Sequence, residues 1–205
     1  MAKKSIFLIR HGLTPGNKER RYIGLHTDEA LSAEGRAQAE AIREQLASQL
    51  SGAPDRITAS AMKRTVETAT ILFDGASVQK FAELREMDFG MFEGKTNEEL
   101  RDDPRYRACI ESGGTMEIPG GEKREDFFRR SFSGFLKALG EQDVEETVAV
   151  VCHGGTIMAV MQQLLGGDYY DYMVENLCGY RLVLETGDEG ITVLSHHKLG
   201  PWHPA

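Results

Sequence analysis

The chain has 205 residues, of which 40% are hydrophobic and 27% charged, a composition that excludes disordered and fibrous proteins. Its formal net charge of −8 makes it a poor general ligand for nucleic acid or anionic membranes, so neither is expected as a partner. The three cysteines, Cys109, Cys152 and Cys178, are too few and too scattered for a disulfide framework or a cysteine-based zinc site. We therefore expect a single cytoplasmic domain, 1–205, without a targeting or membrane segment.

Strand-like and helix-like stretches alternate along the chain, which predicts an α/β fold with a mostly parallel central sheet. The run 147–151 (TVAVV) is strongly β-branched and predicts a central strand. Further strands are expected at 5–9, 56–59 and 78–81, helices at 32–50, 62–73, 128–139 and from 154 onward, and a terminal hairpin at 180–185 and 191–195. This order of elements predicts a three-layer α/β/α sandwich.

The segment from about 88 to 124 has a different character. It is rich in glycine, proline and charge and has no long apolar period. We interpret it as an insertion within the one domain, a lid over the crevice at the carboxyl ends of the strands.

Two histidines occupy equivalent places in the sequence. His11 follows the first expected strand in I-R-H-G, and His153 follows the strongest one in V-C-H-G-G. Ligands of open α/β sheets bind beyond the carboxyl ends of the strands, so neighbouring parallel strands would bring both imidazoles to one crevice. The glycines behind them leave room for backbone N–H groups to approach an anion. One such histidine is a weak signal, but two in matching contexts favour a site.

Arginines supply the positive charge that an anion site needs. Arg10 ends the first apolar strand, where a charge requires a partner, and Arg64 lies near the start of the next helix. A guanidinium binds phosphate oxygens in a bidentate manner and keeps its charge. Arg64 taken alone is more commonly a solvated helix charge. Asn17 can donate its amide to the same anion or simply cap a turn.

The expected site also needs a proton donor. Glu86 opens the 88–124 segment, and a buried glutamate beside a phosphate would have a raised pKa and could protonate a leaving oxygen. The chemistry of the residues alone does not separate Glu86 from Glu83, Asp88 or Glu93.

These motifs resemble the histidine phosphatase superfamily, in its phosphoglycerate-mutase-like branch. The matching segments are L-I-R-H-G-L-T-P-G-N at 8–17, R-Y-I-G at 21–24, S-A-M-K-R-T-V-E-T-A at 60–69, L-R-E-M-D-F-G-M-F-E-G at 84–94, P-G-G-E at 119–122 and V-C-H-G-G-T at 151–156. They follow the family's order and span nearly the whole chain. The usual S-P-L of the second motif reads Ser60-Ala61-Met62 here, which puts loop shape and substrate preference in doubt, not the reaction.

The resemblance implies that His11 is the phosphorylated nucleophile and that Glu86 is the general acid and later the base. It assigns the phosphate pocket and its lining to Arg10, Asn17, Ile23, Gly24, Arg64, His153 and Gly154. It implies a neutral His11 held by a backbone carbonyl, and a charged His153 that joins the arginines in the role a metal ion has elsewhere. No metal or cofactor is expected.

The resemblance favours a phosphomonoester hydrolase that acts on a small phosphorylated metabolite, with α-ribazole 5'-phosphate and sugar phosphates as possible substrates. A phosphoglycerate mutase is the first alternative, with Arg101, Arg105 and Arg107 as contacts for a second anion or as surface charges. A non-catalytic phosphate-binding regulator is the second alternative. The His196-His197 pair and His203 suggest a metal hydrolase, but adjacent strand residues point to opposite faces. A homodimer is a further possibility.

Overall fold

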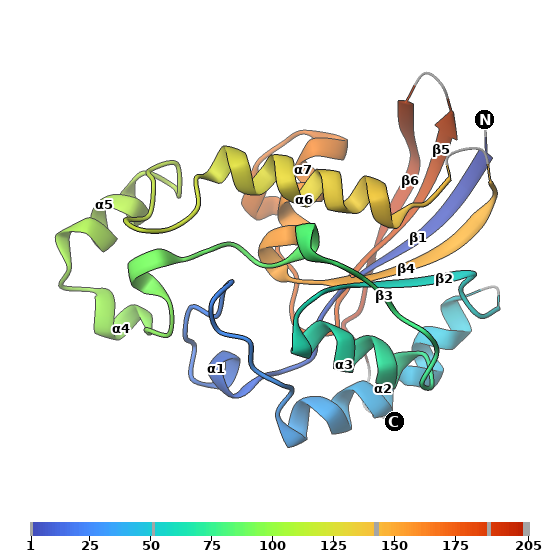
Figure 1. Cartoon of the computed structure of the whole chain (residues 1–205), viewed down its shortest axis with the longest axis horizontal. Coiled ribbons are helices and arrows are strands. Elements are labelled where there is room, and N and C mark those ends of the chain that lie inside the picture. The colour runs from blue at the N-terminus through green and yellow to red at the C-terminus, as the bar shows by residue number, and fades with distance from the viewer. Residues whose placement is uncertain (1, 51, 142–143, 188–189, 203–205) are drawn as a thin grey trace.

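A computed structural model describes the chain except residues 1, 51, 142–143, 188–189 and 203–205. Its described residues form one sheet of six strands in the order β3-β2-β4-β1-β5-β6 (Figure 1). The strands are β1 (Ala2–Arg10), β2 (Arg56–Ser60), β3 (Gln79–Phe81), β4 (Glu146–Cys152), β5 (Gly179–Gly187) and β6 (Gly190–Leu199). The first four in this spatial order are parallel, and β5 and β6 form an antiparallel hairpin at the other side. The mostly parallel sheet and the terminal hairpin are confirmed.

Strand β1 shows how the layers arise, because its successive side chains point to opposite faces. Ile6 and Leu8 pack in the cluster that contains α6 (Arg124–Ala138) and α7 (Gly154–Leu165). Their neighbours in the strand, Phe7 and Ile9, pack in the cluster that contains the other two long helices, α2 (Ala33–Gln49) and α3 (Lys63–Leu72). Figure 1 shows the two helix pairs on opposite sides of the sheet. The predicted three-layer sandwich is therefore confirmed.

Two strands are longer than their apolar runs. Strand β1 begins at Ala2 rather than residue 5, because the buried ammonium group of Lys4 lies 3.1 Å from the carboxylate of Glu146 on β4. Strand β6 continues through His196 and His197, both exposed at the edge of the sheet. Hydrophobic patterning missed these ends because ladder hydrogen bonds form regardless of side-chain polarity.

The 88–124 segment contains three short helices: η2 (Gly90–Phe92), α4 (Asn97–Leu100) and α5 (Pro104–Glu111). They surround a small apolar cluster of their own, made of Phe92, Leu100, Tyr106 and Cys109 with partly buried neighbours. Helices of this length are too short to show a helical period, so the sequence did not predict them.

The remaining helical turns are α1 (Pro15–Lys18), η1 (Ala82–Leu84) and η3 (Tyr169–Tyr172). Among the described residues, no helix has the length and apolar character that crossing a bilayer requires.

Packing of α6 on the sheet can be tested at Phe135, which is fully buried, with the exposed Leu136 as a matched control. We expect Phe135→Ala to lower the free energy of unfolding by about 3–5 kcal/mol, because it leaves a cavity in the core. Leu136→Ala should change it by less than about 0.5 kcal/mol. Urea denaturation followed by circular dichroism measures both, and equal effects would contradict the packing.

Candidate active site

His11 lies directly beyond β1, and its backbone N–H donates to the carbonyl of Cys152 at the end of β4. The side-chain Nδ1 lies 2.7 Å from the carbonyl oxygen of Gly12. A carbonyl only accepts, so Nδ1 carries the proton and the lone pair of Nε2 is left for attack. Burial, followed by the charges of Arg64 and Arg10, lowers the pKa of His11 well below its usual 6.5. The expected contact of His11 with a backbone carbonyl is confirmed, and the lowered pKa favours the expected neutral imidazole.

His153 follows β4 directly and is the N-cap residue of α7, and its ring centroid lies 5.2 Å from that of His11. Nε of Arg64 donates to its Nδ1 at 3.2 Å, so the other ring nitrogen, Nε2, carries the proton and donates to Oγ of Ser60 at 2.9 Å. Burial, followed by the charge of Arg64, lowers the pKa of His153 well below its usual value. The expectation of a charged His153 is therefore wrong for the unliganded protein.

The side chain of Arg64 is fully buried and is held by backbone carbonyls. Nη1 donates to the carbonyl of Thr27 at 2.8 Å, and Nη2 lies 3.4 Å from the carbonyl of Ile23 and 3.3 Å from that of Gly24. Two predicted pocket residues, Ile23 and Gly24, thus contact the site through their backbone. A Cβ on Gly24 would lie 2.2 Å from the carbonyl oxygen of Met87, which explains the glycine.

Arg10 lies at the end of β1, beside the first turn of α7. Its Nη1 donates to the carbonyl of Val174 at 2.8 Å, whereas its Nε is buried and has no partner among the described residues. A Cβ built on Gly154 would lie 3.4 Å from that Nε. A buried donor without a partner is costly, and the N-terminus of α7 adds further N–H groups that favour an anion. Together they indicate a site for an anionic group.

Glu86 supplies the carboxyl group of the site and is only 7% exposed. Its two oxygens accept hydrogen bonds from the backbone N–H groups of Met87, at 2.9 Å, and Gly155, at 3.0 Å. Burial raises the pKa of Glu86. The two N–H groups and the charges of Arg64 and Arg10 lower it, but by less, so the pKa is raised overall. A raised pKa suits a group that must donate a proton near neutrality.

The three rival carboxylates have other partners. Glu83 forms an ion pair with Lys137, Asp88 lies 2.9 Å from Nε2 of His26, and Glu93 accepts the backbone N–H of Gly24. The structure therefore favours Glu86 as the proton donor.

Two polar residues of the site escaped sequence analysis. Ser60, which bonds His153, ends β2, so a polar residue at the end of a parallel strand was an available signal. Asn176 lies in a loop and carries no such signal. Its amide donates to the carbonyl of His11 at 2.9 Å and to the side-chain oxygen of Asn17 at 3.2 Å.

Asn17 also caps α1, because its side-chain oxygen lies 3.4 Å from the backbone N–H of Thr14. With that oxygen taken by Thr14 and Asn176, the N–H₂ group of Asn17 remains for an anion. The two interpretations of Asn17, a cap and an anion contact, are thus compatible.

The described part of the chain contains no cluster of three histidine, cysteine or acidic residues that could hold a metal ion. His196 and His197 lie on β6, far in the sheet order from the ends of β4 and β2, and His203 is outside the described residues.

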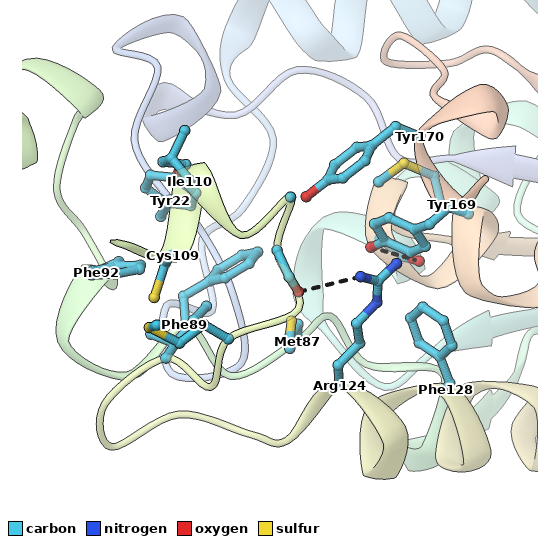
Figure 2. Close-up of a pocket in the computed structure, with 16 residues that line it drawn as sticks. Tyr22, Met87, Phe89, Phe92, Cys109, Ile110, Arg124, Phe128, Tyr169 and Tyr170 are labelled. Carbon is cyan, nitrogen blue, oxygen red and sulfur yellow. Dashed lines mark hydrogen bonds between the residues drawn. The ribbon is translucent and has the colours of Figure 1, made fainter. Parts of the chain in front are cut away.

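A cavity of about 490 Å³, shown in Figure 2, opens beside Met87, the residue that follows Glu86. Met87 and Gly155, which bond the carboxylate of Glu86, line one end of it. The other walls come from Tyr22, from the 88–124 segment, and from residues of α6, α7 and η3. The site therefore has a polar part at the strand ends and a mostly apolar part beside it.

The chain is similar to proteins of a known family. The model of the histidine phosphatase superfamily (branch 1) matches residues 6–197. Phosphoserine phosphatase 1 of Hydrogenobacter thermophilus is 31% identical to this chain, over 80% of this chain and 77% of its own length. Phosphoglycerate mutase-like protein 4 of Arabidopsis thaliana is 30% identical, over 77% of this chain and 70% of its own length. The crystal structure of a putative alpha-ribazole-5'-P phosphatase from Escherichia coli superposes with a TM-score of 0.76 at 25% identity, over 94% of each chain.

The charge states of the two imidazoles can be measured directly. We expect 15N NMR of the unliganded protein to show both rings neutral at pH 6, with His11 protonated on Nδ1 and His153 on Nε2. An unperturbed imidazole with a pKa of about 6.5 is mostly charged at that pH, so a labelled histidine peptide is the reference. Signals are assigned with His11→Ala and His153→Ala, and an imidazolium pattern for either ring would contradict the site described above.

Proposed function

The chain belongs to the histidine phosphatase superfamily, branch 1, and is a phosphatase; we propose that it hydrolyses phosphomonoesters through a phosphohistidine at His11. The observation that carries this proposal is the buried His11, whose Nδ1 bonds a backbone carbonyl and so leaves the lone pair of Nε2 for attack, close to the buried Arg64 and the half-buried Arg10. The arginines neutralise the phosphoryl oxygens, and the reaction then depends on positioning and charge stabilisation.

In the first step, Nε2 of His11 attacks phosphorus and the ester P–O bond breaks. Glu86, protonated because of its raised pKa, gives its proton to the leaving oxygen, which departs as an alcohol. The bond from Nδ1 to the carbonyl of Gly12 stabilises the cationic phosphohistidine. His153, neutral before substrate binds, can donate from Nε2 or gain a proton as the dianion raises its pKa.

In the second step, water replaces the alcohol. The carboxylate of Glu86 takes a proton from this water as its oxygen attacks phosphorus, and the P–N bond breaks. Phosphate leaves, and His11 returns to its neutral form with the proton on Nδ1.

A mutase would need a second cluster of cations for the other phosphate of its substrate. Arg101 and Arg105 are exposed and lie within 4.0 Å of neighbouring carboxylates, Arg101 with Glu98 and Arg105 with Asp103. Arg107 is exposed as well. This arrangement supports the hydrolase over the mutase. A non-catalytic regulator is disfavoured because every group of the proposed reaction is present.

The substrate is proposed to be a small phosphorylated metabolite, with α-ribazole 5'-phosphate and sugar phosphates as the initial candidates. The likeness to the structure named as an alpha-ribazole-5'-P phosphatase supports the first. The proposed cytoplasmic location and homodimer stay predictions.

The role of His11 is tested with 4-nitrophenyl phosphate in the presence of EDTA. We expect hydrolysis to survive chelation and to fall at least about 10³-fold in His11→Ala, because the nucleophile is lost. His197→Ala, an exposed histidine on β6, is the control and should keep full activity. Full activity of His11→Ala would overturn the proposed reaction, and so would the loss of wild-type activity on addition of EDTA.

The role of Glu86 is tested with Glu86→Gln on an alkyl and an aryl ester. For the alkyl ester, kcat/KM should fall by about 10²–10⁴-fold, because a poor leaving group needs the proton. For 4-nitrophenyl phosphate, whose leaving group departs without a proton, kcat/KM should fall much less. Because only protonated Glu86 donates, kcat/KM of the wild type for the alkyl ester should fall as pH rises through its pKa, and the variant should lack this limb. Glu83→Gln is the control, and an equal loss on both esters would argue against Glu86 as the acid.

A further inference from the structure

The cavity beside Glu86 lies where the leaving group of a substrate must go. Glu86 must contact the ester oxygen to protonate it, so the alcohol extends from this carboxyl group away from the arginines. Met87 and Gly155 bond the carboxylate with their backbone N–H groups and also line the cavity. This step rests on the proposed function, since it takes Glu86 as the acid.

The walls of this cavity are largely aromatic or aliphatic. Phe89, Phe92 and Ile118 line it from the 88–124 segment, Met158 from α7 and Tyr169 from η3. Figure 2 shows Tyr169 on the side opposite Phe89 and Phe92. No carboxylate is among the described residues that line it. A leaving group rich in hydroxyls would lose its water here and find few partners, whereas a flat apolar ring would gain from burial.

Among the described residues that line the cavity, Arg124 is the single charged one. Its guanidinium carbon lies 5.1 Å from the ring centroid of Phe128 and 5.0 Å from that of Tyr169, so the side chain is held by cation–π contacts. Nη1 donates to the carbonyl of Gly114 at 3.3 Å, a bond drawn as the dashed line from Arg124 in Figure 2. No carboxylate among the described residues pairs with Arg124. A guanidinium has five N–H donors, so most of them remain for a ligand.

We propose that the cavity binds the alcohol part of a phosphomonoester, that this part is a bulky aromatic group, and that a hydrogen-bond acceptor on it contacts Arg124. A carboxylate is the strongest such acceptor. The aromatic and aliphatic walls select the ring, and Arg124 selects the substituent. Among the initial candidates, this disfavours simple sugar phosphates.

The test compares three esters of primary alcohols, so that leaving-group reactivity differs little: glycerol 1-phosphate, benzyl phosphate and 4-carboxybenzyl phosphate. We expect kcat/KM for benzyl phosphate to exceed that for glycerol 1-phosphate by about 10- to 100-fold, from burial of the ring. The carboxylate should add about another 10-fold. Arg124→Met should remove the advantage of the carboxylate and keep that of the ring.

Matched controls separate these effects from general damage. Arg129→Met, an exposed arginine on the same helix that pairs with Asp126, should leave all three esters unchanged. Ile110→Glu, at the exposed rim of the cavity, should reduce the preference for benzyl over glycerol 1-phosphate, whereas Leu136→Glu outside it should not.

Three outcomes would overturn the inference. Equal kcat/KM for benzyl and glycerol esters removes the aromatic site and leaves the phosphatase intact. An equal loss on all three esters in Arg124→Met places this arginine in the phosphate pocket. If no ester is hydrolysed, the proposed function fails, but the aromatic site can still be tested by calorimetry with benzylphosphonate and methylphosphonate. Tighter binding of benzylphosphonate supports the aromatic site, and equal binding of the two compounds overturns it.

Discussion

The hydrogen bond from Nε of Arg64 to Nδ1 of His153 joins helix α3 to the end of strand β4, and much of the site depends on it. It makes Nδ1 an acceptor, so the proton of His153 lies on Nε2 and points to Ser60. Burial of the ring, followed by the positive charge of Arg64 beside it, lowers the pKa of His153 and favours its neutral form. The positive charge of the unliganded pocket therefore comes from Arg10 and Arg64. A dianionic phosphate would balance these two positive charges, and protonation of His153 would then become more favourable.

Glu86 stands at the boundary between this positively charged pocket and the apolar cavity. Its burial favours the neutral acid, while the N–H groups of Met87 and Gly155 favour the carboxylate. A group balanced in this way can release a proton in one step and take one in the next. The same N–H group of Gly155 that bonds the carboxylate belongs to the first turn of α7, so acid and anion site are held by one rigid element.

The reaction and its selectivity are located in different parts of the chain. His11, Ser60 and His153 lie at the ends of parallel strands, where the core fixes their positions. Most of the described residues that line the cavity belong to the 88–124 segment, which has a small apolar cluster of its own. Substitutions in that segment can change the shape of the cavity and leave the strand ends in place. Relatives with different printed names, a phosphoserine phosphatase and a phosphoglycerate mutase-like protein, are consistent with this separation.

The sequence by itself determined the layered fold, because apolar β-branched runs and helical periods are local signals that survive in the folded chain. It also predicted the members of the candidate site, through ordered motifs at His11, Glu86, His153, Arg10 and Arg64. Only the tertiary structure decided the neutral state of His153, because a pKa depends on burial and on charges brought from elsewhere in the chain. The contact of Ser60 with His153 joins residues 93 positions apart, and the cavity with Arg124 is formed by four separate segments. Such distances between remote residues exist only once the chain has folded.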